Sequence, residues 1–176
     1  MSTRGSCILL LKVSAGSGFA PFMSFIEFRE QAARAGAKTG PIFIFHGCRY
    51  KEYDFLDLLL KEACTALNIK TFRAYSRADP GKLDHVSFRS IYRQILGGEQ
   101  CPKTLLVKRG YVQDLIAEKG EMVADIARDG GYMYACGGVS VVTGIRNQLK
   151  RTLEEQGSMS LEKLIASRRF QEEKFG

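Results

Sequence analysis

The chain has 176 residues and a net charge of +7, from 26 basic and 19 acidic side chains. A chain of this length folds most often as one domain around one core, so we expect a single domain over residues 1–176. No apolar run approaches the ~20 residues of a membrane span, and no cluster of basic residues or motif typical of nucleic-acid binding is present. We therefore expect neither a membrane span nor nucleic acid as a partner.

The five cysteines are odd in number, widely spaced and without a Cys-x-x-Cys pair. With only two histidines beside them, neither a disulfide framework nor a metal site is expected. The first residues lack the pattern of a secretory signal. The expected location is the cytoplasm, where a partner could hold the chain at the cytoplasmic face of a membrane.

Strands and helices are predicted to alternate along the chain. Short apolar runs predict strands at 7–13, 41–48, 71–75 and 132–136. Apolar residues at helical spacing predict helices at 21–35, 54–67, 112–116, 122–128 and 139–156, and a further helix start at Ser160. This alternation predicts an α/β fold with a parallel sheet covered on both faces, whose ligands bind beyond the carboxyl ends of the strands.

The first predicted strand runs directly into a glycine turn, Gly16-Ser17-Gly18, and Pro21 then opens the next helix. Glycines let backbone N–H groups approach a ligand closely, and a helix start carries unpaired donors and a positive dipole. Proline suits the first helical turn because its missing N–H has no partner there. The turn predicts a phosphate cradle; the alternative is an ordinary strand-to-helix connection.

The segment 16–22 resembles the Gly-Thr-Gly-(Ile/Val)-Ala-Pro-Phe turn that holds the NADPH pyrophosphate in the ferredoxin–NADP reductase superfamily. Five further motifs follow in that family's order, and the resemblance is strongest to the C-terminal NADPH-binding module of diflavin reductases. It implies a Rossmann-like three-layer sandwich: a five-stranded parallel sheet, order 3-2-1-4-5, with helices on both faces. The fifth strand is expected near Arg169 and Phe170.

Two motifs at predicted strand ends match the family's phosphate contacts. Arg49 follows the second strand in Gly-Cys-Arg, where the family's arginine approaches the cofactor phosphates. Ser76 and Arg77 follow the third strand and match the family's Ser-Arg pair. A dianionic 2′-phosphate needs hydrogen-bond donors and fixed positive charge, whereas an NAD site places an acidic residue at the ribose, so NADPH is favoured over NADH.

A third motif resembles the family's Lys-x-Tyr-Val-Gln segment, which completes the 2′-phosphate and adenine pocket. Arg109, Tyr111 and Gln113 occupy the matching positions, and Lys108 is a basic neighbour that could substitute. By contrast, the segment 73–76 (Arg-Ala-Tyr-Ser) reads like an FAD-binding motif of partner domains. Its place in a strand, directly before Arg77, indicates an accidental match.

The last two motifs match the nicotinamide end. Cys136 and Gly137 match Tyr-Val-Cys-Gly-Asp, in which the cysteine lies near the nicotinamide and assists hydride transfer; Gly138 replaces the aspartate. Glu173 stands where relatives use an aspartate to stabilise the nicotinamide, and Phe175 matches the aromatic residue that stacks on FAD. Without the resemblance, a buried core cysteine and a frayed, charged terminus are the simpler interpretations.

The resemblance implies a module that delivers hydride from NADPH to FAD, catalytic only together with an FAD domain. The chain has no room for FAD or FMN domains, so we expect these, and an electron acceptor such as a haem protein, to be partners. Residues 79–108 are a predicted insertion, either lineage-specific or a gene-model error. The alternatives are a degenerate or sensing NADPH-binding module and a basic interaction module with a borrowed fold.

Overall fold

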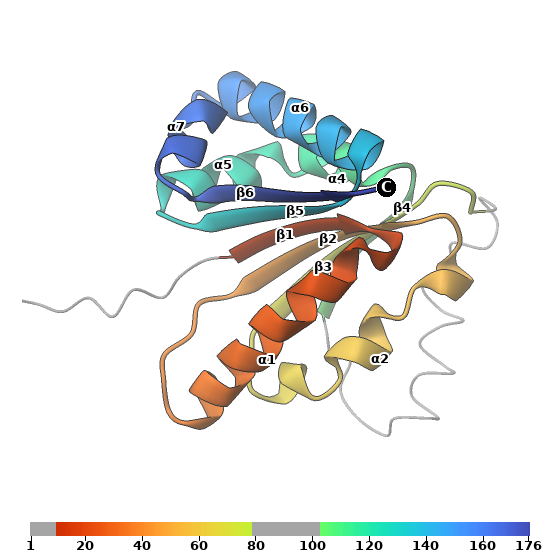
Figure 1. The fold of residues 1–176 in the computed structure, drawn as a ribbon, viewed down its shortest axis with the longest axis vertical. Coiled ribbons are helices and arrows are strands. Elements are labelled where there is room, and N and C mark those ends of the chain that lie inside the picture. Colours follow the sequence, from red (N-terminus) through yellow and green to blue (C-terminus); the bar gives the residue numbers. More distant parts are fainter. Residues whose placement is uncertain (1–9, 79–102) are drawn as a thin grey trace, which may run out of the picture.

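The computed structural model describes residues 10–78 and 103–176 (Figure 1). Its centre is a six-stranded sheet in the order β4-β3-β2-β1-β5-β6, in which every neighbouring pair is parallel. The strands are β1 (Leu10–Ala15), β2 (Ile42–Cys48), β3 (Ile69–Tyr75), β4 (Lys103–Arg109), β5 (Tyr132–Gly138) and β6 (Phe170–Phe175). All six strands therefore end at the same edge of the sheet.

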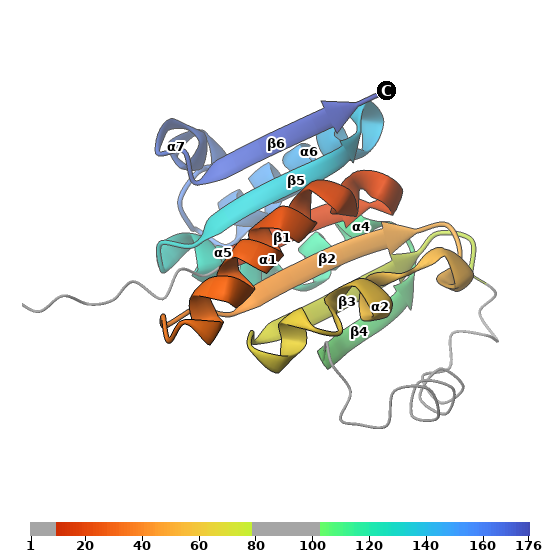
Figure 2. The same ribbon diagram turned by 60° about the horizontal axis from the view of Figure 1, so that its bottom comes forward.

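Helices cover both faces of the sheet. The helices α1 (Ala20–Arg34) and α2 (Leu56–Leu60) lie on one face, and α4 (Val112–Glu118), α5 (Gly120–Arg128), α6 (Val139–Glu155) and α7 (Leu161–Ala166) lie on the other (Figures 1 and 2). Short 3-10 turns span Gly16–Phe19, Lys51–Tyr53 and Ala63–Thr65. The predicted three-layer α/β fold is confirmed.

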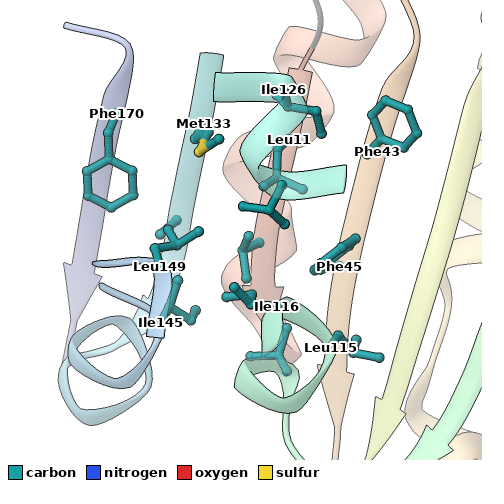
Figure 3. Close-up of a cluster of buried hydrophobic side chains, with 14 of the residues drawn as sticks. Leu11, Phe43, Phe45, Leu115, Ile116, Ile126, Met133, Ile145, Leu149 and Phe170 are labelled. Atoms are coloured by element: carbon teal, nitrogen blue, oxygen red, sulfur yellow. The ribbon is translucent and has the colours of Figure 1, made fainter. Parts of the chain in front are cut away.

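Each face of the sheet has its own apolar core, because successive residues of a strand point to opposite sides. Leu11, Phe45 and Met133 point toward α4, α5 and α6 and form the larger cluster with Ile116 and Ile145 (Figure 3). On the other face, Ile42 and Ile44 of β2 and Leu10 of β1 pack with Phe22 and Ile26 of α1. The two cores fix the strands, and with them the loops at the carboxyl edge.

The prediction of five strands was wrong by one. The expected fifth strand near Arg169 is β6, and the order 3-2-1-4-5 holds when β4 is set aside. The added strand, β4, is a mainly polar edge strand in which only Leu106 packs against the core. It contains residues 103–108 of the predicted insertion; the remainder, 79–102, lies outside the described residues, so the insertion itself stays a prediction.

The single helix predicted over 54–67 was also wrong. The segment contains only the five-residue α2 and the 3-10 turn at Ala63–Thr65. Asp54 does not begin a longer helix, because its side chain caps α2 through the Leu56 N–H (3.0 Å) and also binds buried groups of β3.

Candidate functional site at the carboxyl edge of the sheet

A cavity of about 840 Å³ opens at the carboxyl ends of β1, β2 and β3. Its wall combines the turn after β1, the loop after β2, the residue after β3 and the start of α4. Six of the residues predicted from the sequence line it: Gly16, Ser17, Arg49, Ser76, Tyr111 and Gln113. The cavity therefore lies where an α/β sheet binds its ligands.

The glycine turn after β1 has the geometry expected of a close-approach loop. Gly16 has φ +54°, a left-handed conformation that favours glycine, and open space beside it. A Cβ on Gly18 would lie 2.4 Å from the carbonyl oxygen of Cys136, so only glycine lets this turn pack against the end of β5. Pro21 lies in the first turn of α1, as predicted.

Backbone hydrogen bonds continue the sheet beyond the ends of β2 and β3 and bring two predicted motifs together. The Ser76 N–H donates to the Cys48 carbonyl (2.9 Å), and the Arg77 N–H donates to the Arg49 carbonyl (2.8 Å). The side chains of Arg49 and Arg77 are exposed. Two arginine side chains therefore follow the ends of two adjacent strands, an arrangement suited to the paired phosphates of a nucleotide.

The start of α4 brings the third motif to the same edge. Arg109 ends β4 beside Tyr75, and the Tyr111 N–H donates to the Asp114 carboxylate (2.7 Å), which caps the helix. This cap leaves the Tyr111 side chain 65% exposed and able to stack on a planar ring. Gln113 lines the cavity. Arg77 and Arg109 lie beside the cavity and do not line it.

The predicted nicotinamide residues lie on β5 and β6, outside the cavity. Cys136 is directly opposite Glu173 in the strand register, and Gly138 is opposite Phe175. Cys136 is buried, and burial, reinforced by the negative charge of Glu173, raises the pKa of its thiol. Gly18 of the glycine turn packs against the Cys136 carbonyl, so the β5 and β6 residues lie next to the cavity. The predicted residues therefore form one line along the carboxyl edge, from β4 to β6.

Gly137, the remaining predicted residue, is buried and packs against the first turn of α6. An added Cβ would lie 3.4 Å from Val141 Cγ1, at van der Waals contact. Gly137 thus lies beside the start of α6 and does not itself line the cavity. The prediction that it contacts the cofactor is not tested by this geometry.

A buried polar group in the wall of the cavity, His46 with Cys48, was not predicted from the sequence. The two ring nitrogens of His46 pair with Ser14 Oγ (2.9 Å) and Cys48 Sγ (3.1 Å). Burial lowers the pKa of His46 to about 4, with Arg73 adding to the effect and Asp54 opposing it. Burial raises the pKa of Cys48 to about 12. His46 and Cys48 are therefore neutral at physiological pH, and the neutral ring donates a hydrogen bond through one nitrogen and accepts one through the other.

The segment that reads like an FAD-binding motif has a structural role. Tyr75 is buried and its hydroxyl donates to Asp54 (2.6 Å); burial, and then the Asp54 charge, raise the pKa of Tyr75. Arg73, also buried, forms ion pairs with Asp54 and Asp57. These contacts attach the loop after β2 to β3 and position Arg49 and Ser76 above it.

Other kinds of site find no support in the part of the chain that the structure describes. Within residues 10–78 and 103–176, no group of three or more histidine, cysteine or acidic side chains could hold a metal ion. Over the same residues, no helix combines the length and apolar character needed to cross a membrane.

Residues 13–147 match the family described as "Oxidoreductase NAD-binding domain". The chain is 30% identical over 134 residues to the NADPH–cytochrome P450 reductase of Candida maltosa, covering 74% of this chain and 16% of that protein. It is 31% identical over 133 residues to the methionine synthase reductase of Bos taurus, covering 73% and 16% respectively. It is 30% identical over 151 residues to the mitochondrial pyruvate dehydrogenase [NADP(+)] of Euglena gracilis, covering 84% and 7%. The chain thus spans less than a fifth of these relatives.

Proposed function

Because the chain belongs to the oxidoreductase NAD-binding domain family, we propose that it is the NADPH-binding module of a flavoprotein oxidoreductase. The observation that supports this most strongly is the single line of predicted residues along the carboxyl edge. Phosphate-binding groups lie at its β2–β4 end, and Cys136, Glu173 and Phe175 lie at its β5–β6 end. This order matches an extended dinucleotide with its adenosine at one end and its nicotinamide at the other.

The residues present fit the phosphates of such a cofactor. Gly16, Ser17 and the first turn of α1 offer backbone donors, a hydroxyl and a helix dipole to a pyrophosphate. Arg49 and Arg77 supply positive charge from adjacent strand ends. Ser76 lines the cavity beside them, and its hydroxyl is suited to donate to a 2′-phosphate.

The adenine is assigned to Tyr111, whose exposed ring can stack on it. Gln113 offers an amide from the same helix, and Arg109 adds a third positive charge to the 2′-phosphate. The relatives from Candida maltosa and Euglena gracilis have names that specify NADPH and NADP(+), in agreement with this assignment.

At the other end, the chain itself positions and shields the reacting groups. When bound, NADPH supplies a hydride from its nicotinamide ring, and FAD held by another domain or chain accepts it. Cys136 offers a neutral, buried thiol against the ring, and Glu173 offers negative charge opposite it. Phe175, 44% exposed at the end of β6, would stack on the bound flavin and would have to move for the nicotinamide to reach it.

The partners follow from the same proposal. An FAD domain must supply the flavin, and an FMN domain would carry electrons onward to an acceptor such as a haem protein. The low share of each relative that the chain covers leaves ample length for such domains in those proteins.

The test is reduction of a separately purified FAD domain of the diflavin type. NADPH and this chain together should bleach the flavin absorbance much faster than NADPH with the FAD domain alone. Cys136→Ala should slow this bleaching and leave NADPH binding nearly unchanged. If the wild-type chain produced no acceleration, its role in hydride delivery would be refuted.

A second candidate is a degenerate or sensing module that binds NADPH and transfers no hydride. Two departures from the family pattern favour it: Gly138 stands in place of an aspartate, and the longer Glu173 side chain replaces another. Such a module would release normal binding heat with NADPH and would leave flavin absorbance unchanged in the same experiment.

A further inference from the structure

The half of the sheet formed by β5 and β6 is open on the α1 side. In Figure 2, α1 lies over β1 and β2, and no helix within residues 10–78 and 103–176 crosses β5 or β6 on that side. On the opposite side, α6 packs against β5 and β6 and buries Val142 and Ile145. Of the two faces of the sheet, only the one on the α1 side is therefore open to a large partner at β5 and β6 within the described residues.

Strand register and side-chain contacts show which residues of β5 and β6 face the α1 side. Cys136 packs with the core beneath α1, so Glu173, its register partner, faces the same way. Glu172 faces the other way, because its carboxylate binds Arg146 of α6 (3.0 Å). Phe175, two residues beyond Glu173, returns to the α1 side. The open side thus carries the residues assigned to hydride transfer.

Helix α1 extends this side with exposed aromatic residues. Phe25 is 45% exposed and Phe28 is 73% exposed, and their spacing of three residues places them on one side of the helix. The Phe25 ring lies 5.3 Å from the ring of Tyr134 on β5, so the aromatic surface continues from the helix onto the sheet. Beneath it, Lys12 Nζ lies 4.4 Å from the centre of the Phe25 ring and is fully buried.

We propose that this surface, which we call the open face (Phe25, Phe28, Tyr134, Glu173 and Phe175), docks the flavin-bearing domain, and that Phe28 is its apolar anchor. The inference rests on the proposed function, since a hydride acceptor must approach Cys136 and Glu173 from this side. A protruding aromatic residue at the centre of an interface typically contributes much of the binding energy.

The open face includes the proposed hydride-transfer residues Glu173 and Phe175, and this favours a flavin-bearing domain as the molecule that docks on it. A second copy of the chain seated here would cover Cys136 and Phe175 in both molecules and exclude the flavin. A flavin-bearing domain docked on the open face would bury Phe28 and, in the same position, place its flavin ring against Phe175. The relatives, of which this module is about 16%, have the length to place such a domain against it.

The test compares two variants that each add one negative charge to an exposed apolar position, one inside the open face and one outside it. Phe28→Glu places a charge on the open face, and Leu58→Glu places one at a 69% exposed position of α2, away from it. Binding of an FAD-loaded domain of the diflavin type to each full-length chain is measured by interferometry. We expect at least a tenfold weaker affinity for Phe28→Glu, a smaller loss for Phe28→Ala and no change for Leu58→Glu.

Three results would overturn the proposal: no binding by the wild-type chain, equal binding by Phe28→Glu and Leu58→Glu, or a wild-type dimer in sedimentation that Phe28→Glu dissociates. Calorimetry with NADPH keeps the test separate from the proposed function. Phe28→Glu should bind NADPH as the wild-type chain does, which also shows that it is folded. Normal NADPH binding with unchanged docking would reject the open face and leave the NADPH module standing.

Discussion

Lys12 is the most unusual residue of the core, and replacing it with methionine should stabilise the protein. It is fully buried in β1 among the rings of Phe22, Phe25 and Tyr134, and its amine donates a long hydrogen bond of 3.4 Å to the Phe22 carbonyl. Burial, and then the charge of Arg29, lower its pKa from 10.5 to about 7. Methionine has nearly the same length and no proton to lose.

The size of the effect follows from the pKa. Between pH 7 and 10.5 the unfolded chain holds a proton on Lys12 that the folded chain has released, so wild-type stability rises with pH in this window. At about 1.4 kcal/mol per pH unit, burying the amine costs about 3 kcal/mol at pH 8. Lys12→Met should therefore be more stable by about that amount, and its advantage should shrink by about 2 kcal/mol from pH 7.0 to pH 8.5.

Urea unfolding followed by circular dichroism at these two pH values measures both quantities. Lys61→Met, at an exposed position after α2, serves as the control and should change stability little at either pH. An advantage for Lys12→Met that stayed constant with pH, or a variant less stable than the wild type at both values, would refute the reasoning.

Two further predictions concern the buried groups beside the cavity. His46 stays neutral in the fold with a pKa near 4 against 6.5 when unfolded, so acidification from pH 6.5 to 4 should remove about 3 kcal/mol of stability. His46→Gln should abolish most of this loss in urea unfolding; an unchanged acid sensitivity would contradict the assignment. Gly18→Ala should lower stability by about 2 kcal/mol and weaken NADPH binding, because its Cβ meets the Cys136 carbonyl at 2.4 Å. Calorimetry and thermal melts matching the wild type would show that the turn is not so tightly packed.

The sequence predicted most of the fold because buried parallel strands are nearly continuous apolar runs. It missed β4, since the apolar run in Lys103–Arg109 is only three residues long, is followed by basic residues and lies at the end of the predicted insertion. It also merged α2 with the turn after it, because helical spacing of apolar residues does not show the buried Asp54–Arg73 ion pair that fixes the loop.

The sequence also predicted where several of the candidate site residues lie. Short motifs at strand ends predicted that Arg49, Ser76 and Tyr111 meet at one edge, and all three line one cavity because parallel strands bring their carboxyl ends together; their roles in binding stay predictions. The hydrogen bonds of His46 could not be predicted, since its partner Ser14 lies on another strand 32 residues away. The burial of Lys12 was likewise hidden, because a single lysine in an apolar run gives no sign of which rings will enclose it.

The central claim is that arginine and serine side chains at the ends of β2 and β3 bind the 2′-phosphate of NADPH. Calorimetric titration of the wild-type chain, Arg77→Ala and the exposed α6 control Arg151→Ala, each with NADPH and with NADH, tests it most directly. We expect the wild-type chain to prefer NADPH, and Arg77→Ala to lose roughly 10- to 100-fold in NADPH affinity with little change for NADH, since a charged hydrogen bond contributes about 1.5–3 kcal/mol. No binding heat with NADPH, or an equal loss for the two nucleotides, would contradict the claim.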